Sequence, residues 1–264
     1  MFSFLPLPFE GLPNTRDLGG FPAAGGKTVR KKRLLRSGQL ISATKKDLKI
    51  LEEEYRLAKI FDFRSPVERR TVPDPAIPGC RLYETDVLSP EATGVTGKTN
   101  GLDDLFCRMR EDPDFAFHYF GPFYRELATA PLARKGYASF LRELIALPED
   151  RAALWHCAAG KDRTGIGTAH LLFALGTPAE VIRADYLSHN ENQKKELDRL
   201  VAENTNGDER LAKNFRDFYS VFPQFFDAAI DAMARFAGSP EAFPEKGLGL
   251  TKEEIEKLRE NFLE

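Results

Sequence analysis

A ten-residue stretch, HCAAGKDRTG at positions 156–165, places a thiol, two cations and a carboxylate between two apolar runs. The first run covers residues 152–155 and the second covers residues 166–175. Reactive groups at the junction of two buried elements conflict with their surroundings, and such conflicts usually mark a functional site. We therefore take this stretch as the candidate for chemistry.

The thiol belongs to Cys157, and its place before a predicted helix favours a nucleophile. A free cysteine has a pKa of about 8.5 and reacts only as the thiolate. A helix N-terminus carries roughly half a positive charge and several unpaired N–H groups, which favour an anion. If the helix begins near Arg163 or Thr164, the loop curls with its N–H groups inward and Cys157 at its floor. The hydroxyl of Thr164 is then within reach of the thiolate.

The other residues of the stretch suit an oxyanion. The guanidinium of Arg163 is a planar fork that matches two phosphate oxygens. Ala158, Ala159 and Gly160 are small, which lets the backbone approach an oxyanion closely. His156 is expected to orient the loop by bonding backbone carbonyls. The stretch therefore predicts a phosphate-binding loop.

Other motifs fit this stretch poorly. The nucleotide-binding loop GxxxxGK[ST] fails because Trp155 stands at its first glycine and Asp162 follows Lys161 where Ser or Thr is required. No GxSxG occurs, so a Ser-His-Asp hydrolase of that type is not indicated. The remaining cysteines, Cys80 and Cys107, are interpreted as small buried hydrophobic residues.

The stretch resembles the Cys-x5-Arg signature of the cysteine-dependent phosphatases. More narrowly, it resembles the HCxxGKDRTG loop of the bacterial atypical tyrosine phosphatases, which include dual-specificity and phosphoinositide-active members. Five further segments are similar to that family in the same order: NTRDLGG (14–20), LLRSGQL (34–40), DFRSPVE (62–68), DYLSHN (185–190) and GLGLT (247–251). The resemblance covers nearly the whole chain.

The resemblance implies a two-step mechanism with no metal and no cofactor. Cys157 attacks phosphorus and forms a phosphocysteine, while Arg163 and the loop N–H groups stabilise the equatorial oxygens. A general acid protonates the leaving oxygen and then activates water. The family counterpart of Asp162 is usually given that role. Asp62, at the carboxyl end of a predicted parallel strand, is the alternative, and Asp17 is a third candidate that is more in keeping with a structural role.

Lys161 distinguishes this loop from those of ordinary tyrosine phosphatases. A second cation near the pocket suits a phosphoinositide or an acidic phosphopeptide, whereas the alternative is that Lys161 only balances Asp162. The expected substrate is a protein phosphotyrosine, with phosphoserine, phosphothreonine and phosphoinositides as extensions. A catalytically inactive phosphate-binding module and a rhodanese-type sulfurtransferase are the competing functions. The presence of Cys157 with Arg163 argues against the first, and Arg163 with Thr164 argues against the second.

Composition sets wider limits. The 264 residues are 42% hydrophobic and 30% charged, as is usual for a globular domain. A net charge of −2 gives no basic field for nucleic acid or an acidic membrane. The apolar N-terminus has no basic region and contains Pro6 and Pro8, so we do not interpret it as a signal peptide. No apolar run approaches the roughly 20 residues of a membrane span.

Three cysteines are too few for a disulfide framework, and their spacing matches no zinc motif. We therefore expect a reducing, cytoplasmic environment, with export by a non-classical route as the weaker alternative. The sequence does not indicate an oligomeric state.

Strands alternate with helices early in the chain, and helices dominate the rest. This order predicts an α/β fold of the cysteine-phosphatase type, a single domain of residues 1–264 with a parallel-dominated sheet flanked by helices. The strands are expected at 31–37, 57–63, 80–87 and 151–157. Capping boxes are predicted for Thr44 with Asp47, Ser65 with Glu68, and Thr251 with Glu254, and a simple cap at Thr177.

The segment 88–147 is predicted to form a helical insertion or lid, although it could equally be a cover for the sheet. Residues 88–101 are expected to be a loop, and 102–147 helical with breaks near Pro113, Pro122 and Pro131. Residues 164–175 are apolar almost all round, which predicts a buried helix that ends at Gly176.

Overall fold

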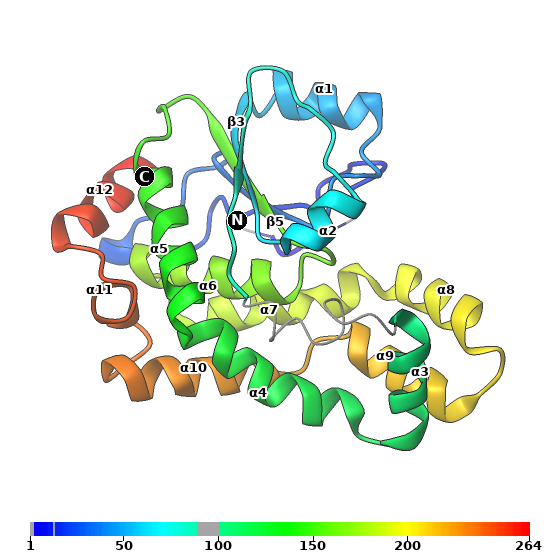
Figure 1. Cartoon of the computed structure of the whole chain (residues 1–264). Helices are drawn as coiled ribbons and strands as arrows, with labels where there is room; N and C mark the ends of the chain where they lie inside the picture. Colours follow the sequence, from blue (N-terminus) through cyan, green and yellow to red (C-terminus); the bar gives the residue numbers. More distant parts are fainter. Residues whose placement is uncertain (1–2, 13, 89–100) are drawn as a thin grey trace.

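The computed structural model describes residues 3–12, 14–88 and 101–264, the side chains of residues 101–103 excepted. Within these residues a five-stranded sheet has the order β1-β2-β5-β3-β4 (Figure 1). The strands are β1 (Arg16–Asp17), β2 (Leu34–Ser37), β3 (Leu57–Asp62), β4 (Arg81–Glu84) and β5 (Ala152–His156). β1 is antiparallel to β2 and all other pairs are parallel, which confirms the predicted α/β class.

β5 is the central strand, and all five of its residues are buried. Successive side chains point to opposite faces of a sheet. Leu154 accordingly joins the apolar cluster on one face, whereas Trp155 joins the larger cluster on the other. Ser37 and Asp62 are both paired in register with His156, so the carboxyl ends of three parallel strands meet at one edge. Cys157 leaves the sheet at this edge.

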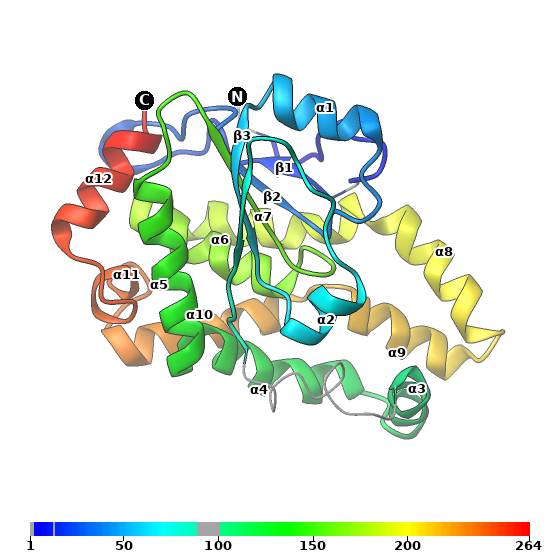
Figure 2. The same ribbon diagram turned by 45° about the horizontal axis from the view of Figure 1, so that its top comes forward.

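Helices cover both faces of the sheet unequally (Figures 1 and 2). α1 packs on one face and α6 on the other, while α4 and α10 lie side by side in an outer layer. α3, α8 and α9 form a group at one end of the molecule. The described helices are α1 (Lys45–Glu53), α2 (Pro66–Thr71), α3 (Gly101–Glu111), α4 (Phe115–Thr129), α5 (Pro131–Ile145), α6 (Asp162–Leu175), α7 (Ala179–Asn192), α8 (Lys194–Thr205), α9 (Glu209–Tyr219), α10 (Pro223–Ala237), α11 (Phe243–Lys246), α12 (Lys252–Phe262) and a short 3-10 turn at Ala24–Gly26.

Most local stop and start signals are confirmed. All three capping boxes form, at the N-termini of α1, α2 and α12. Gly176 ends α6 in the left-handed conformation with a φ of 76°. The predicted cap at Thr177 is wrong, because Pro178 occupies the N-cap position of α7 and Thr177 lies one residue too early.

The aromatic segment 102–147 forms α3, α4 and α5. The breaks near Pro113 and Pro131 are confirmed, but the break at Pro122 is wrong because this proline lies inside α4. A proline costs an internal hydrogen bond, and here the apolar face of α4 packs along α10, which holds the helix through that position. The predicted loop 88–101 lies, except at its ends, outside the described residues. That 88–147 opens and closes as a lid stays a prediction.

Two cysteines outside the candidate loop differ in exposure. Cys80 is partly buried and packs against the apolar cluster beneath α1. Cys107 is exposed, so its predicted burial is wrong. Leu105 and Met109 turn the apolar face of α3 toward α9, and a residue between them points the opposite way. Among the described helices, we find none with the length and hydropathy that a bilayer crossing requires.

Candidate active site

The stretch HCAAGKDRTG runs from the end of β5 into the first turn of α6, as predicted, although α6 already begins at Asp162. Cys157 is the first residue after the strand and is only 2% exposed. His156 contacts the loop through its ring, with Nδ1 3.1 Å from the carbonyl oxygen of Cys157. Thr164 is fully buried, and its hydroxyl has no hydrogen-bond partner within the described chain.

Three consecutive carbonyls of the loop are held from its outer side. The donors are Gln39 N to Ala158 O at 2.9 Å, Asn14 Nδ2 to Ala159 O at 3.1 Å, and Arg36 Nη2 to Gly160 O at 2.9 Å. In a trans peptide unit the C=O and the following N–H point in opposite directions. The three contacts therefore turn the N–H groups of residues 159–161 toward the inside of the loop.

The inward N–H groups are free to bind a ligand. For the described chain, no acceptor is found for the backbone N–H groups of residues 158–164, and Gly165 N is the first to bond, to Lys161 O at 2.9 Å. Gly160 has a φ of 70°, and a Cβ there would lie 2.5 Å from the carbonyl oxygen of Ser37. Glycine is thus required both by conformation and by space. Unpaired N–H groups at a helix N-terminus form an anion-binding site.

A buried ion cluster supports the loop from below. Asp185 of α7 pairs with Arg16 at 3.1 Å and with Arg36, and all three side chains are 1% exposed. Burial and the charge of Arg36 lower the pKa of Arg16 to about 10, so it remains cationic at neutral pH. Burial opposes the charged form of Asp185, but Arg36 and Arg16 outweigh it and lower its pKa. The segments NTRDLGG, LLRSGQL and DYLSHN meet in this cluster.

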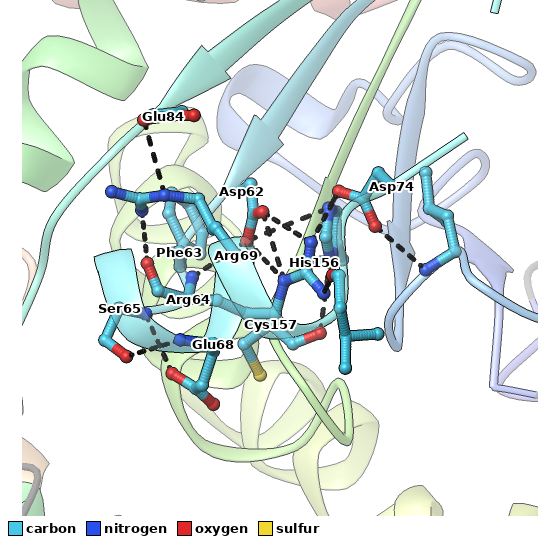
Figure 3. A network of polar contacts seen from close by, with 12 residues as sticks. Asp62, Phe63, Arg64, Ser65, Glu68, Arg69, Asp74, Glu84, His156 and Cys157 are labelled. Atoms are coloured by element: carbon cyan, nitrogen blue, oxygen red, sulfur yellow. Dashed lines mark hydrogen bonds and ion pairs between the residues drawn. The ribbon is translucent and has the colours of Figure 1, made fainter. Parts of the chain in front are cut away.

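Arg163 is held by Glu68 through two hydrogen bonds, Nη1 to Oε2 at 2.6 Å and Nη2 to Oε1 at 2.9 Å. Burial disfavours the charged form of each side chain, but the attraction between the two charges outweighs that effect. The pKa of Glu68 falls to about 2 and that of Arg163 rises. Figure 3 shows Glu68 and Cys157 at the same side of the polar network, and both line one cavity. No described acceptor contacts Nε of Arg163, so the Nε–Nη2 edge of the guanidinium is open to a further planar acceptor.

Asp162 lines the cavity and accepts two hydrogen bonds on one oxygen. Tyr124 Oη and Lys161 Nζ both donate to Oδ1, the latter at 3.0 Å, and Tyr186 Oη donates to Tyr124 Oη at 2.7 Å. Lys161 is 3% exposed and lies over the ring of Phe120, with Nζ 4.2 Å from the ring centre. The ammonium of Lys161 therefore binds the carboxylate of Asp162 directly.

Asp62 lies outside the cavity lining. Its two oxygens accept from Nε and Nη2 of Arg64, and it is 1% exposed. Asp62, Asp74 and His156 form the one described group with ligand atoms close enough for a metal, within 4.8 Å (Figure 3). The guanidinium of Arg64 already contacts both carboxylates, at 2.7 and 2.9 Å, so the chain supplies the countercharge itself.

Asp17 has a local structural role. Its two carboxylate oxygens accept from the backbone N–H groups of Gly19 and Lys32, at 2.9 and 2.8 Å. Burial raises its pKa, more than those hydrogen bonds lower it. It does not line the cavity above Cys157.

The cavity above Cys157 has a volume of about 230 Å³. Its floor contains six of the predicted loop residues: Cys157, Ala158, Ala159, Lys161, Asp162 and Arg163. Its other lining residues are mainly apolar or aromatic: Glu68, Leu88, Leu105, Tyr119, Phe120, Phe123, Phe218 and Tyr219. Three further residues predicted for the site, Gly160, His156 and Thr164, do not line the cavity.

Sequence reasoning missed two parts of this site. It assigned Glu68 only to a capping box, although its place in the family-like segment DFRSPVE was a signal for a further role. It also left open what the aromatic helices do, and α4 and α9 prove to supply the cavity wall. No local pattern predicts which aromatic residues of a helix line a cavity.

Comparison with known proteins agrees with this geometry. Residues 7–264 match the sequence model described as the tyrosine phosphatase family. A protein of Cupriavidus necator named "Putative tyrosine-protein phosphatase" is 36% identical over 193 residues, which cover 70% of this chain and 63% of that protein. The triple specificity protein phosphatase PtpB of Mycobacterium tuberculosis is 40% identical over 80 residues, or 30% of this chain and 28% of that protein. The aligned parts thus span less than two thirds of either relative. The chain belongs to the tyrosine phosphatase family.

Proposed function

We propose that this chain hydrolyses phosphotyrosine esters in two steps through a phosphocysteine at Cys157. The observation that carries the proposal is the ring of inward N–H groups above Cys157, completed by the free edge of Arg163. These donors face the equatorial oxygens of a phosphoryl group, and such preorganised charge dominates the catalysis of phosphoryl transfer.

In the first step the thiolate of Cys157 attacks phosphorus in line. The new S–P bond forms as the P–O bond to the tyrosine breaks, and the leaving oxygen takes a proton from Asp162. In the second step Asp162, now a carboxylate, takes a proton from water, whose oxygen attacks phosphorus and releases the thiolate and inorganic phosphate.

We assign the acid to Asp162 rather than Asp62 on position. Asp162 lines the cavity, and both of its donors meet Oδ1, which leaves Oδ2 to carry a proton. Both oxygens of Asp62 are committed to Arg64.

The expected substrate range follows from the aromatic residues that line the catalytic cavity. Tyr119, Phe120, Phe123 and Phe218 favour an aromatic ester by stacking and edge contacts, so we expect phosphoserine and phosphothreonine to be slower substrates. We do not extend the proposal to phosphoinositides, because Lys161, the cation expected to meet a second phosphate, is paired with Asp162.

The test is phosphate release from an aryl phosphate by the wild type and by Cys157→Ser, with trapping of labelled phosphoenzyme. We expect activity and a trapped phosphothiol in the wild type and neither in the variant. Binding of phosphate without turnover would indicate an inactive module, and transfer of sulfur from thiosulfate to cyanide would indicate a sulfurtransferase.

A second measurement tests the acid. With aryl phosphates of rising leaving-group basicity, Asp162→Asn should slow the poorest leaving groups most, whereas Asp62→Asn should change all of them by one factor. The reverse pattern would assign the acid to Asp62.

A further inference from the structure

A second cavity adjoins the catalytic one. It has a volume of about 330 Å³ and shares three lining residues with the catalytic cavity: Ala158, Ala159 and Tyr219. Tyr219 and the outer edge of the loop thus form the wall between the two spaces.

The second cavity differs from the catalytic one in charge. Its described lining contains one carboxylate, that of Glu196, and neither lysine nor arginine. His189 adds no charge, because burial and the nearby Lys161, Arg16 and Arg36 lower its pKa well below the usual value. Its Nδ1 lies 3.1 Å from Nδ2 of Asn14, as expected for a neutral ring that accepts from an amide.

Glu196 is not an isolated charge. Both of its oxygens accept from Arg199, Oε2 from Nε at 3.0 Å and Oε1 from Nη2 at 2.5 Å. Arg199 also pairs with Glu203, so these three residues carry a net charge of −1, and it is this excess negative charge that remains for a cation. The carboxylate of Glu196 is the member of this group that lines the cavity. The catalytic cavity, in contrast, is lined by two cations, Lys161 and Arg163, and by the two carboxylates that pair with them, Asp162 and Glu68.

The remaining lining suits a long side chain with a polar end. Leu197 and Leu200 of α8 provide an apolar surface, and Gln39, Gln193 and Ser42 provide hydrogen-bonding groups near it. Lysine and arginine lay their aliphatic stems on apolar surface and keep the charged head near water. Successive residues of an extended peptide are about 3.4 Å apart, and the two cavities share three lining residues, so a residue that flanks the phosphotyrosine lies near the second cavity.

We propose that this second cavity is a substrate subsite that takes a basic side chain flanking the phosphotyrosine of a peptide, with Glu196 as the residue that selects it. The inference rests on the proposed function, since it needs a phosphotyrosine anchored above Cys157. It also separates peptides from phosphoinositides, whose second phosphate would meet a carboxylate and no cation in this cavity.

The test compares two phosphotyrosine peptides that differ only in carrying lysine or glutamate on both sides of the phosphotyrosine. For the wild type we expect kcat/KM to favour the lysine peptide about fivefold, as is typical of a partly exposed charge pair. Glu196→Lys should reverse the ratio, and Gln193→Lys should reduce it. The ratio divides out any general loss of activity.

The matched control is Glu203→Lys. Glu203 shares the partner Arg199 with Glu196 and lies on the same helix, but it does not line the cavity. This control should keep the wild-type ratio. Equal kcat/KM for the two peptides, or an equal change of the ratio in Glu196→Lys and Glu203→Lys, would overturn the subsite.

A third substrate, a phosphoinositide in mixed micelles, completes the test. Faster hydrolysis of this lipid than of the lysine peptide would also overturn the subsite. If an aryl phosphate is hydrolysed while the peptide ratio is one, the subsite is wrong and the proposed function stands. If the wild type does not hydrolyse the aryl phosphate, both fail.

Discussion

Replacing Glu68 by glutamine tests whether Arg163 depends on its ion pair. In the native protein the carboxylate binds two guanidinium nitrogens, at 2.6 and 2.9 Å, and the backbone N–H of Ser65 at 2.8 Å. Glutamine keeps the volume and one acceptor oxygen. It loses the negative charge and turns an NH₂ group toward a donor of Arg163, which leaves a buried cation with an incomplete shell.

The cost to stability follows from the pKa of Glu68. It falls from an ordinary value of 4.5 to about 2, because the hydrogen bond and charge of Arg163 outweigh burial. At about 1.4 kcal/mol per pH unit, this lowered pKa corresponds to about 3 kcal/mol of stability, to which the hydrogen bonds from Ser65 also contribute. A lowered native pKa gives stability that is present above the unfolded pKa and is lost as pH falls through the native one. The difference between wild type and Glu68→Gln in urea denaturation should therefore be full above pH 4.5 and shrink toward pH 2.

Catalysis should fall as well, because Glu68 occupies one edge of the guanidinium and so directs the other edge toward the phosphate. Misplacement of a catalytic group by about 1 Å can cost about 100-fold. We expect kcat/KM of Glu68→Gln on an activated aryl phosphate to fall by about 10- to 100-fold, and the affinity for the inhibitor orthovanadate to fall with it.

The matched control is Ser65→Ala, which removes the cap of the same short helix and leaves the ion pair in place. It should cost about 1 kcal/mol of stability with little change in kcat/KM. If Glu68→Gln loses stability but retains full kcat/KM, Glu68 only anchors α2, and the argument that it orients Arg163 fails.

Three further predictions concern the loop. Arg163→Lys should lower kcat/KM nearly as much as Arg163→Ala, by at least about 100-fold, because lysine keeps the charge but not the planar fork; near-normal activity of the lysine variant would show that charge suffices. Gly160→Ala should destabilise the protein by about 1–3 kcal/mol in thermal unfolding, since its φ is 70° and the new Cβ would meet the carbonyl oxygen of Ser37; an unchanged melting temperature would contradict the loop geometry. Lys161→Ala should lower kcat/KM for an aryl phosphate and for a phosphoinositide by similar factors, because its ammonium bonds Asp162; a loss confined to the phosphoinositide would show that it binds a second phosphate instead.

Much of the candidate site was predictable because its loop residues are contiguous in sequence. The spacing of Cys157 and Arg163, with small residues between them, is enough to predict an anion-binding loop. The order of a strand followed by a helix then determines which way that loop opens. The capping boxes were equally local, since a residue and its third successor form each of them. The N-cap expected at Thr177 was wrong, although it too was a local prediction, because α7 starts one residue later and Pro178 occupies the N-cap position.

The missed features are side-chain contacts that no rule of sequence spacing predicts, whether their partners are near or far along the chain. The expectation for Asp62 was half correct: it does end β3 in register with His156, at the edge where the loop begins. What sequence could not indicate is that Arg64, two residues on, turns back to take both oxygens. Glu68 meets Arg163 across 95 positions of sequence. A parallel sheet brings such residues to one edge, but side-chain packing decides which of them face the cavity.

Three of the scattered family-like segments, NTRDLGG, LLRSGQL and DYLSHN, meet beneath the same loop. Asn14 and Arg36 each hold a loop carbonyl, and Arg36 is held in turn by Asp185. Two buried arginines against one aspartate leave a net positive charge beneath the loop, in a medium where charges act more strongly than in water. Burying such a cluster costs desolvation energy, and packed apolar residues in its place often stabilise a fold equally well. Its contribution is to the loop: the guanidinium of Arg36 turns the N–H of Lys161 inward and adds positive potential where a phosphate dianion would bind.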